Sequence, residues 1–266
     1  MIAALALLLA APLELASGAG SASAKVTGPV KLELRAYAAD LEVVASDKPA
    51  VTLTVEGKPG LRVALFASGD RLEAQFSGKR QLREGRARIE LPRGSSVDLS
   101  SVSGAVVVRD LGGDVRVRGM SGRVEVSGAL QVDVETIDGV ARIAASAGPL
   151  RIHTISGAVS IESTNPALQA EAETSSGAFT LRGPCAKGCH VDVDSVSGPL
   201  LFELDRASSF ALDFDTHSGK LKDSLGLDKG QVEKRGEDDW RELRFGAGEG
   251  AIECETFSGD VTVSAR

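Results

Sequence analysis

Pairs of acidic residues recur toward the C-terminal end of the sequence, and one residue separates the members of each pair. They are Glu171 with Glu173, Asp192 with Asp194, Asp213 with Asp215, and Glu253 with Glu255. The first three pairs are 21 residues apart. A fold that repeats with this period places Glu171, Asp192 and Asp213 directly above one another, and likewise Glu173, Asp194 and Asp215. Because calcium prefers carboxylate oxygens, the spacing predicts either a ladder that binds divalent cations or a solvated acidic face.

The three cysteines suggest a second kind of chemistry. Cys185 and Cys189 bracket Ala186-Lys187-Gly188 in a predicted loop, and Cys254 stands at a position expected to face inward. In an exported protein the close pair predicts a local disulfide, because the compartment is oxidising. The alternative is a zinc site formed by Cys185, Cys189 and His190. Cys254 is expected to be a buried free thiol.

Residue types and spacing give no support to a catalytic site. His153, His190 and His217 fall in different repeats, and no nucleophile motif accompanies them. Clefts that bind polysaccharides usually contain aromatic platforms, whereas this chain has one Trp, one Tyr and eight Phe. The sequence therefore predicts a protein that is not an enzyme, with no catalytic residue and no cofactor.

A repeated glycine organises the elements that must position these residues. A Ser-Gly or Asp-Gly pair returns at steps of 18, 17, 18, 20, 21, 21 and 40 residues. The residues five and seven positions before each glycine are apolar, and those four and six before it are mostly polar. Each repeat is therefore predicted to contain two short strands around one bend. Glycine suits the bend because it permits positive φ or close backbone approach. The predicted bend glycines are Gly104, Gly122, Gly139, Gly157, Gly177, Gly198, Gly219 and Gly259.

A repeat of this size predicts an all-β solenoid. One coil cannot bury its apolar side alone, but stacked coils pair each strand with its equivalent in the next coil and fill a continuous inner column. We expect a right-handed parallel β-helix with about 18 to 21 residues per coil. An antiparallel sandwich is the competing interpretation of many short alternating strands.

The chain is expected to contain a leader and two structural regions. Residues 1–24 have an apolar run and end in Ala22-Ser23-Ala24, which is typical of a signal peptide and its cleavage site. Residues 25–95 lack the glycine register and predict a β-rich N-terminal cap. Residues 96–266 are expected to form the β-helix, with an irregular insertion at 222–250 and a final coil at 251–264.

Several segments resemble a known family. They are residues 89–94 (IELPRG), 97–108 (VDLSSVSGAVVV) and 255–263 (ETFSGDVTV). With this pattern, the chain over roughly residues 30–266 resembles the bacterial secreted domains named the putative-adhesin family. The resemblance implies a parallel β-helix and a role in the periplasm or at the cell surface. It supplies no catalytic residue.

Charge and surface composition narrow the partners. The 37 acidic residues outnumber the 30 basic ones, for a net charge of −7, which disfavours nucleic acid and anionic membranes. No transmembrane segment is expected in the mature chain. We expect an interaction module at the cell envelope that binds an envelope protein, a glycan or another copy of itself. A structural, self-assembling envelope element is the alternative, and a polysaccharide-active enzyme is less favoured. The expected contact face carries Ala105, Val107, Val140, Ala158, Ala178, Pro199 and Leu201.

Overall fold

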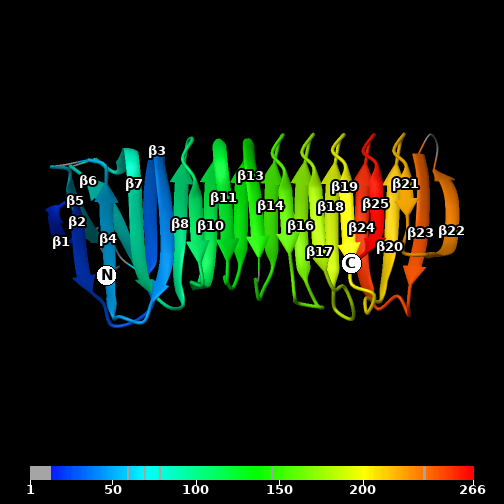
Figure 1. Ribbon diagram of the computed structural model, residues 1–266, viewed down its shortest axis with the longest axis horizontal. Coiled ribbons are helices and arrows are strands. Elements are labelled where there is room, and N and C mark those ends of the chain that lie inside the picture. The colour runs from blue at the N-terminus through cyan, green and yellow to red at the C-terminus, as the bar shows by residue number, and fades with distance from the viewer. Residues whose placement is uncertain (1–12, 59, 69, 78, 145, 236–237) are drawn as a thin grey trace, which may run out of the picture.

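The protein is an all-β molecule. The computed structural model describes residues 13–266, apart from 59, 69, 78, 145, 236 and 237, and only the backbone of the other residues between 229 and 239. The described strands join in one large sheet in which most pairings are parallel. Figure 1 shows the strands side by side in one long row, with β1–β7 at one end and β22 and β23 at the other.

Most strands after residue 94 fall into two columns, and consecutive strands alternate between the columns. As far as β18 and β19, each strand pairs in parallel with the second strand after it. We call two consecutive strands at one level of the columns a rung. The first column contains β8 (Ser95–Ser101), β10 (Gly112–Gly119), β12 (Val132–Thr136), β14 (Leu150–Thr154), β16 (Gln169–Thr174), β18 (His190–Ser195), β20 (Phe210–Thr216) and β24 (Gly250–Thr256).

The second column follows the first with a bend between the two strands of each rung. It contains β9 (Val106–Arg109), β11 (Ser121–Ser127), β13 (Asp138–Ala144), β15 (Val159–Glu162), β17 (Phe179–Gly183), β19 (Leu200–Leu204), β21 (Leu221–Asp223) and β25 (Val261–Ala265). The stacking aligns equivalent residues, for example Val132 with Leu150 and Leu150 with Ala170.

Alternate residues of both columns form the core. The apolar residues five and seven positions before each bend glycine are all buried, as the alternation predicts. Near the C-terminal end the core becomes aromatic, and the ring centroids of Phe179 and Phe202 lie 5.8 Å apart. Each inward position stacks on its equivalent in the next rung, so the core is continuous along the molecule.

The N-terminal cap is built around one long strand. β3 (Lys31–Ser46) pairs with both β8 and β9. It thereby supplies the rung before β8 and β9. The other cap strands are β1 (Leu13–Ala19), β2 (Ser21–Lys25), β4 (Ala50–Glu56), β5 (Arg62–Ser68), β6 (Arg71–Phe76) and β7 (Gln81–Pro92).

Part of the predicted leader belongs to this cap. β1 pairs with β5 and β2 pairs with β4, both antiparallel. Ala22 and Ala24, which flank Ser23 in the predicted cleavage site, are buried. Residues 1–12, which include most of the apolar run, lie outside the described residues. The predicted cleavage after Ala24 stays a prediction, and it would remove β1 and β2.

The order of the last rungs differs from their order in the chain. β24 pairs in parallel with both β18 and β20, so the rung of β24 and β25 lies between that of β18 and β19 and that of β20 and β21. The predicted stacking of Asp213 directly on Asp192 is therefore wrong, because Glu253 lies between them. Glu255 likewise separates Asp194 from Asp215. The segment 251–264 is consequently not the last rung in space.

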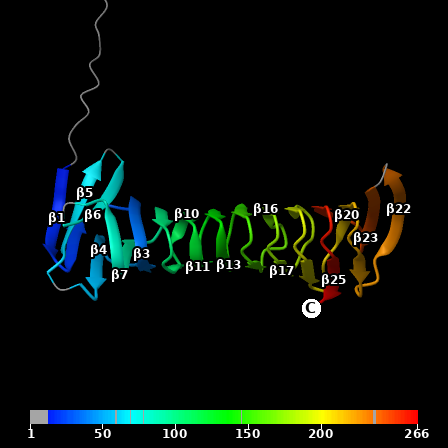
Figure 2. The ribbon, with the colours of Figure 1, turned by 90° about the horizontal axis from the view of Figure 1, so that it is seen from above.

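The predicted irregular insertion contains a hairpin that explains this order. β22 (Asp228–Arg235) pairs antiparallel with β23 (Asp238–Phe245), and β23 pairs antiparallel with β20. The hairpin covers the outer edge of β20, where Phe210 and Phe245 place their ring centroids 5.8 Å apart. After the hairpin the chain returns to the edge of β18 that β16 does not occupy, and β24 lies there between β18 and β20. Figure 2 shows the hairpin at the end of the molecule opposite the cap.

Candidate interaction surface

A short hydrogen-bonded motif fixes the bend in each of six rungs. The residue three positions before the glycine is Ser or Thr, and its hydroxyl oxygen accepts a hydrogen bond from the glycine N–H. The donor–acceptor distances lie between 2.8 and 3.1 Å, for the pairs Ser101–Gly104, Thr154–Gly157, Thr174–Gly177, Ser195–Gly198, Thr216–Gly219 and Thr256–Gly259. These local bonds satisfy a buried backbone donor. They hold successive bends in the same shape.

The bends require glycine mainly because the backbones of neighbouring rungs approach closely there, and less because of positive φ. Of the eight, only Gly122 has positive φ, at 117°. At Gly157 a Cβ would overlap the carbonyl oxygen of Gly139 and lie 2.9 Å from Thr154 Oγ1. Gly139 is the equivalent glycine of the preceding rung. The glycines therefore let bends stack directly on one another.

These bends present an exposed apolar column that the sequence analysis missed. The residue two positions before the glycine is apolar in six of the eight repeats, and Tyr37 of β3 continues the column because its carbonyl oxygen accepts the N–H of Val102. The six large members are between 44% and 58% exposed. We call this column the apolar ridge. Its members are Tyr37, Val102, Met120, Ile137, Ile155, Val196 and Phe257, with Ser175 and His217 at the two remaining levels. The alternation of polar and apolar residues does not predict it, because the ridge lies in the bend and not in a strand.

Beside the ridge, the outward face of the first column carries two acidic columns. The structure orders them as Glu171, Asp192, Glu253, Asp213 and as Glu173, Asp194, Glu255, Asp215. Arg151 pairs with Glu171 at 3.0 Å, and His153 Nδ1 lies 2.8 Å from Glu173. No Lys, Arg or His side chain that the structure describes forms an ion pair with Asp192, Asp194, Glu255 or Asp215. Four of the eight carboxylates of the two columns therefore lack a cationic partner among the described residues.

Crowding of like charges contributes to a raised pKa at one carboxyl group, that of Asp194. Burial raises the pKa of Asp194, and Asp192, Glu255, Glu173 and Glu171 raise it further. The shift is in the direction expected when a carboxylate is partly desolvated among other negative charges.

A groove of about 490 Å³ lies where the acidic columns meet the ridge. Glu173, Asp194, Glu255 and Asp215 line one side, and Ser175, Val196, His217 and Phe257 line the other. The rings of His217 and Phe257 are stacked, with centroids 4.7 Å apart. Carboxylates beside an exposed aromatic ring suit a positively charged group that also has apolar parts.

The predicted cation ladder does not form an assembled metal centre. Within the part of the chain that the structure describes, no group of three His, Cys, Asp or Glu side chains is placed to hold a metal ion. Binding of calcium between Glu171, Glu173, Asp192, Asp194, Asp213 and Asp215 stays a prediction.

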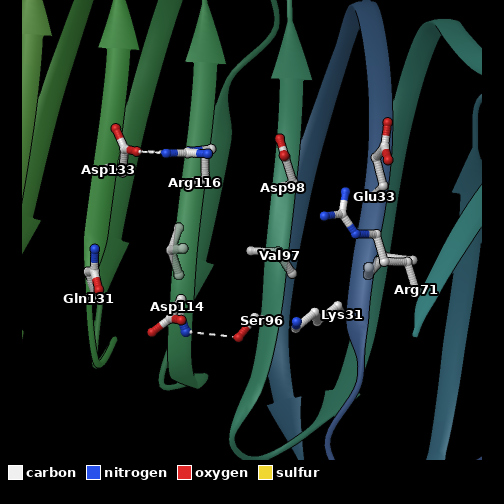
Figure 3. A pocket seen from close by; sticks show the side chains of 12 residues that line it. Lys31, Glu33, Arg71, Ser96, Val97, Asp98, Asp114, Arg116, Gln131 and Asp133 are labelled. Carbon is white, nitrogen blue, oxygen red and sulfur yellow. Dashed lines mark hydrogen bonds and ion pairs between the residues drawn. The ribbon is translucent and has the colours of Figure 1, made fainter. Parts of the chain in front are cut away.

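The same face has a different charge pattern near the cap. Figure 3 shows a groove of about 310 Å³ between β3, β8 and β10, in which acidic and basic side chains are interspersed. Arg116 donates hydrogen bonds to Asp133, whose side chain is largely buried, and this partner raises the pKa of Arg116. Lys31 pairs with Asp70 at 3.0 Å. Charge in this groove is therefore largely compensated.

Two of the three cysteines are joined, and the third is free. The structure joins Cys185 to Cys189 by a disulfide with a Cα–Cα distance of 5.4 Å. Both sulfur atoms of the alternative zinc site are thereby used, and His190 Nδ1 lies 3.8 Å from Glu253. Cys254 is a buried free thiol, and burial raises its pKa well above the ordinary value.

The outward face of the second column contains the small residues predicted to make contact. Val140, Ala158, Ala178 and Pro199 stand one position after their bend glycines and are exposed. Ala105, Val107 and Leu201 are half-buried. Arg123 interrupts the run between Ala105 and Val140, so the exposed small residues form one patch over β13 to β19.

No helix among the described residues is long and apolar enough to cross a membrane.

Comparisons with known proteins place the chain in a family. No curated protein matches the chain. A solved structure described as a putative cell adhesion protein from Clostridium sporogenes is 10% identical and covers 94% of this chain and 100% of its own, with a TM-score of 0.28. A putative adhesin from Parabacteroides distasonis is 11% identical and covers 91% of this chain and 95% of its own, with a TM-score of 0.40.

The family model described as Toastrack DUF4097 matches residues 30–264, which include the rungs and most of the cap. The chain belongs to the DUF4097 toastrack family.

Proposed function

We propose that the two columns wind as a right-handed parallel β-helix of about 18 to 21 residues per coil. Parallel pairing of every second strand supports this arrangement. Aligned residues are 17, 18, 20 and 21 apart along the series Val115, Val132, Leu150, Ala170 and Val191. The β-helix is a stiff scaffold that presents side chains in straight columns.

On this scaffold we propose an adhesin-like interaction module that is not an enzyme and acts at the cell envelope. The observation that carries the proposal is the patch of Val140, Ala158, Ala178 and Pro199 on the second column. Small exposed side chains on neighbouring rungs make a smooth surface with little side-chain entropy to lose on contact. The partner class is an envelope protein, a glycan or another copy of the chain.

Lysine substitutions on the patch test this function. Purified protein is mixed with isolated cell envelopes of the producing bacterium, and the fraction that sediments with them is measured. Ala158→Lys combined with Ala178→Lys should abolish retention, because two long cations break the smooth surface. Ala147→Lys with Ala167→Lys is the matched control, since both alanines are exposed in loops between rungs. Equal retention of the two double variants would contradict the proposal.

Export is proposed on the leader-like sequence alone. The mature protein then begins at Lys25 and lacks β1 and β2, which leaves one edge of β4 and one edge of β5 without those partners. Mass spectrometry of the protein isolated from the envelope fraction tests this. A mature N-terminus at Lys25 is expected, and an intact N-terminus at Met1 would contradict the cleavage.

A further inference from the structure

The apolar ridge is an exposed surface that nothing in the described part of the single chain covers. Tyr37, Met120, Ile137, Ile155, Val196 and Phe257 are six of the ten large hydrophobic side chains that are exposed among the described residues. Successive rungs are about 4.8 Å apart, so the ridge from Tyr37 to Phe257 extends for about 34 Å. Figure 1 shows the bends in line along a long edge of the molecule. A continuous apolar line of this length marks a contact surface.

Side-chain sizes along the ridge are complementary when its order is reversed. From Tyr37 to Phe257 the ridge has eight levels, in the order Tyr37, Val102, Met120, Ile137, Ile155, Ser175, Val196 and Phe257, and His217 lies one level beyond. When the ridge of a second copy lies antiparallel against it, the smallest member, Ser175, faces the long and flexible Met120. The aromatic residues meet at the two ends. The opposed pairs are Tyr37 with Phe257, Val102 with Val196, Met120 with Ser175, and Ile137 with Ile155.

Charges beside the ridge are also complementary in this arrangement. A two-fold axis perpendicular to both the ridge and the direction of approach keeps the outward faces of the two first columns on one side. The residues two positions before the ridge then meet in reversed order. Arg35 of one copy faces Glu255 of the other, and Arg118 faces Glu173. Glu255 forms no ion pair with a described cation within its own chain, so the contact gives it a partner.

The cap adds positive charge at the end that meets the acidic columns. Lys79, Arg80 and Arg83 are all exposed. Arg83 lies beside Tyr37, because Ala36 pairs with Leu82 and Ala38 with Glu84. Lys79 and Arg83 form no ion pair with another described residue. The antiparallel contact therefore brings a basic cap next to the acidic columns of the second copy.

We propose that two copies of the chain form an isologous dimer along the apolar ridge, antiparallel and in the register that opposes Ile137 and Ile155. One self-complementary ridge serves both copies, as a closed two-fold interface requires. This surface differs from the small-residue patch of the second column, so the dimer is a proposal separate from the interaction module.

Light scattering of the full chain over a dilution series tests the dimer. The wild type should show twice the chain mass at high concentration. Ile155→Asp should raise the dissociation constant at least about tenfold, because it places a charge at the centre of the contact. Leu130→Asp is the matched control, since Leu130 is 52% exposed but lies outside the ridge. A monomeric wild type, or equal association of the two variants, would overturn the proposal.

A charge exchange tests the register. Arg35→Glu and Glu255→Arg should each weaken association, and the double variant should recover it, because the two charges exchange sides of one contact. Failure of the double variant to recover would overturn the antiparallel register. A wild type that stays monomeric but binds a Lys-rich peptide would instead assign the ridge and acidic columns to another protein, and it would overturn the dimer. The envelope-retention assay of the patch variants is independent of each of these results.

Discussion

The outward face of the first column carries two different charge patterns on one backbone. From β8 to β14 acidic and basic residues alternate between rungs, and Arg116 with Asp133 and Arg118 with Asp98 form ion pairs. From β16 to β20 the equivalent positions are all acidic, and four of their eight carboxylates, those of Asp192, Asp194, Glu255 and Asp215, have no cationic partner among the described residues. The bends of both regions keep the same Ser or Thr hydrogen bond to glycine.

This comparison separates what the fold requires from what it leaves free. Inward residues and bend residues must repeat, because each stacks on its equivalent in the next rung. Outward residues meet solvent, so their charge can vary without changing the backbone. At about 4.8 Å in water, a stacked pair of like charges costs on the order of 1 kcal/mol before screening by salt. The acidic region therefore carries an electrostatic cost that the alternating region avoids.

The largest effect is expected where the two regions are alike. Gly157→Ala in the alternating region and Gly198→Ala in the acidic region should each destabilise the protein by at least about 3 kcal/mol. In both, the added Cβ overlaps a carbonyl oxygen of the neighbouring rung. Urea unfolding measures the change. A small loss at either glycine would break the claim that the bends of both regions share one geometry.

Reversing one charge should make the alternating region resemble the acidic one. Arg116→Glu removes the partner of the largely buried Asp133 and adds a third carboxylate near Asp98, so we expect a loss of about 2 kcal/mol. Arg123→Glu is the control, because Arg123 pairs with Glu125 on the exposed face of β11 and should cost less than about 0.5 kcal/mol. Equal losses would mean that charge alternation does not stabilise the first column.

The sequence could predict these columns but not the order of the last rungs. Alternation around each glycine identifies the inward residues, and the buried positions confirm them. The apolar pattern does not decide this order, because Leu212 and Phe214 of β20 match Ile252 and Cys254 of β24. Either strand satisfies the pattern beside β18. The antiparallel pairing of β23 with β20 settles the choice, and no periodicity encodes that contact.

The ridge leaves a signal in the sequence that hydrophobic periodicity does not assign to the surface. An apolar residue precedes the Ser-Gly or Asp-Gly pair in most repeats, as in Ile155-Ser156-Gly157 and Phe257-Ser258-Gly259. Hydrophobic periodicity assigns such residues to a core, yet here the Ser or Thr hydrogen bond turns the chain before them. The side chain consequently points outward. Only the bend geometry separates this position from a buried one.

Removing one charge from the acidic region should give a smaller effect of opposite sign. Asp194→Asn should stabilise the protein at neutral pH by about 0.5 kcal/mol, which raises Tm by about 1 to 2 °C after allowance for solvent screening. Glu135→Gln is the control in the alternating region. Its carboxylate lies 3.8 Å from Arg118, so no gain is expected.

The gain should depend on pH in a defined direction. The folded pKa of Asp194 lies above its ordinary value of 3.8, so the folded protein binds the extra proton more tightly than the unfolded chain. The unfavourable contribution of the carboxylate is therefore present at neutral pH and is lost as pH falls through the raised pKa. The difference in Tm between Asp194→Asn and wild type should shrink toward zero near pH 3.8. A difference that grows on acidification would contradict the direction of the shift.

Disulfide trapping tests the rung order that makes the acidic region continuous. In a Cys254→Ala background, Asp194→Cys is combined either with Glu255→Cys or with Asp215→Cys. Adjacent strands bring Cα atoms within disulfide range, whereas two strand spacings amount to about 9.6 Å, beyond that range. We expect oxidation to cross-link residue 194 to 255 and not to 215, as peptide mapping by mass spectrometry would show. A cross-link from 194 to 215, with none to 255, would contradict the placement of β24 between β18 and β20.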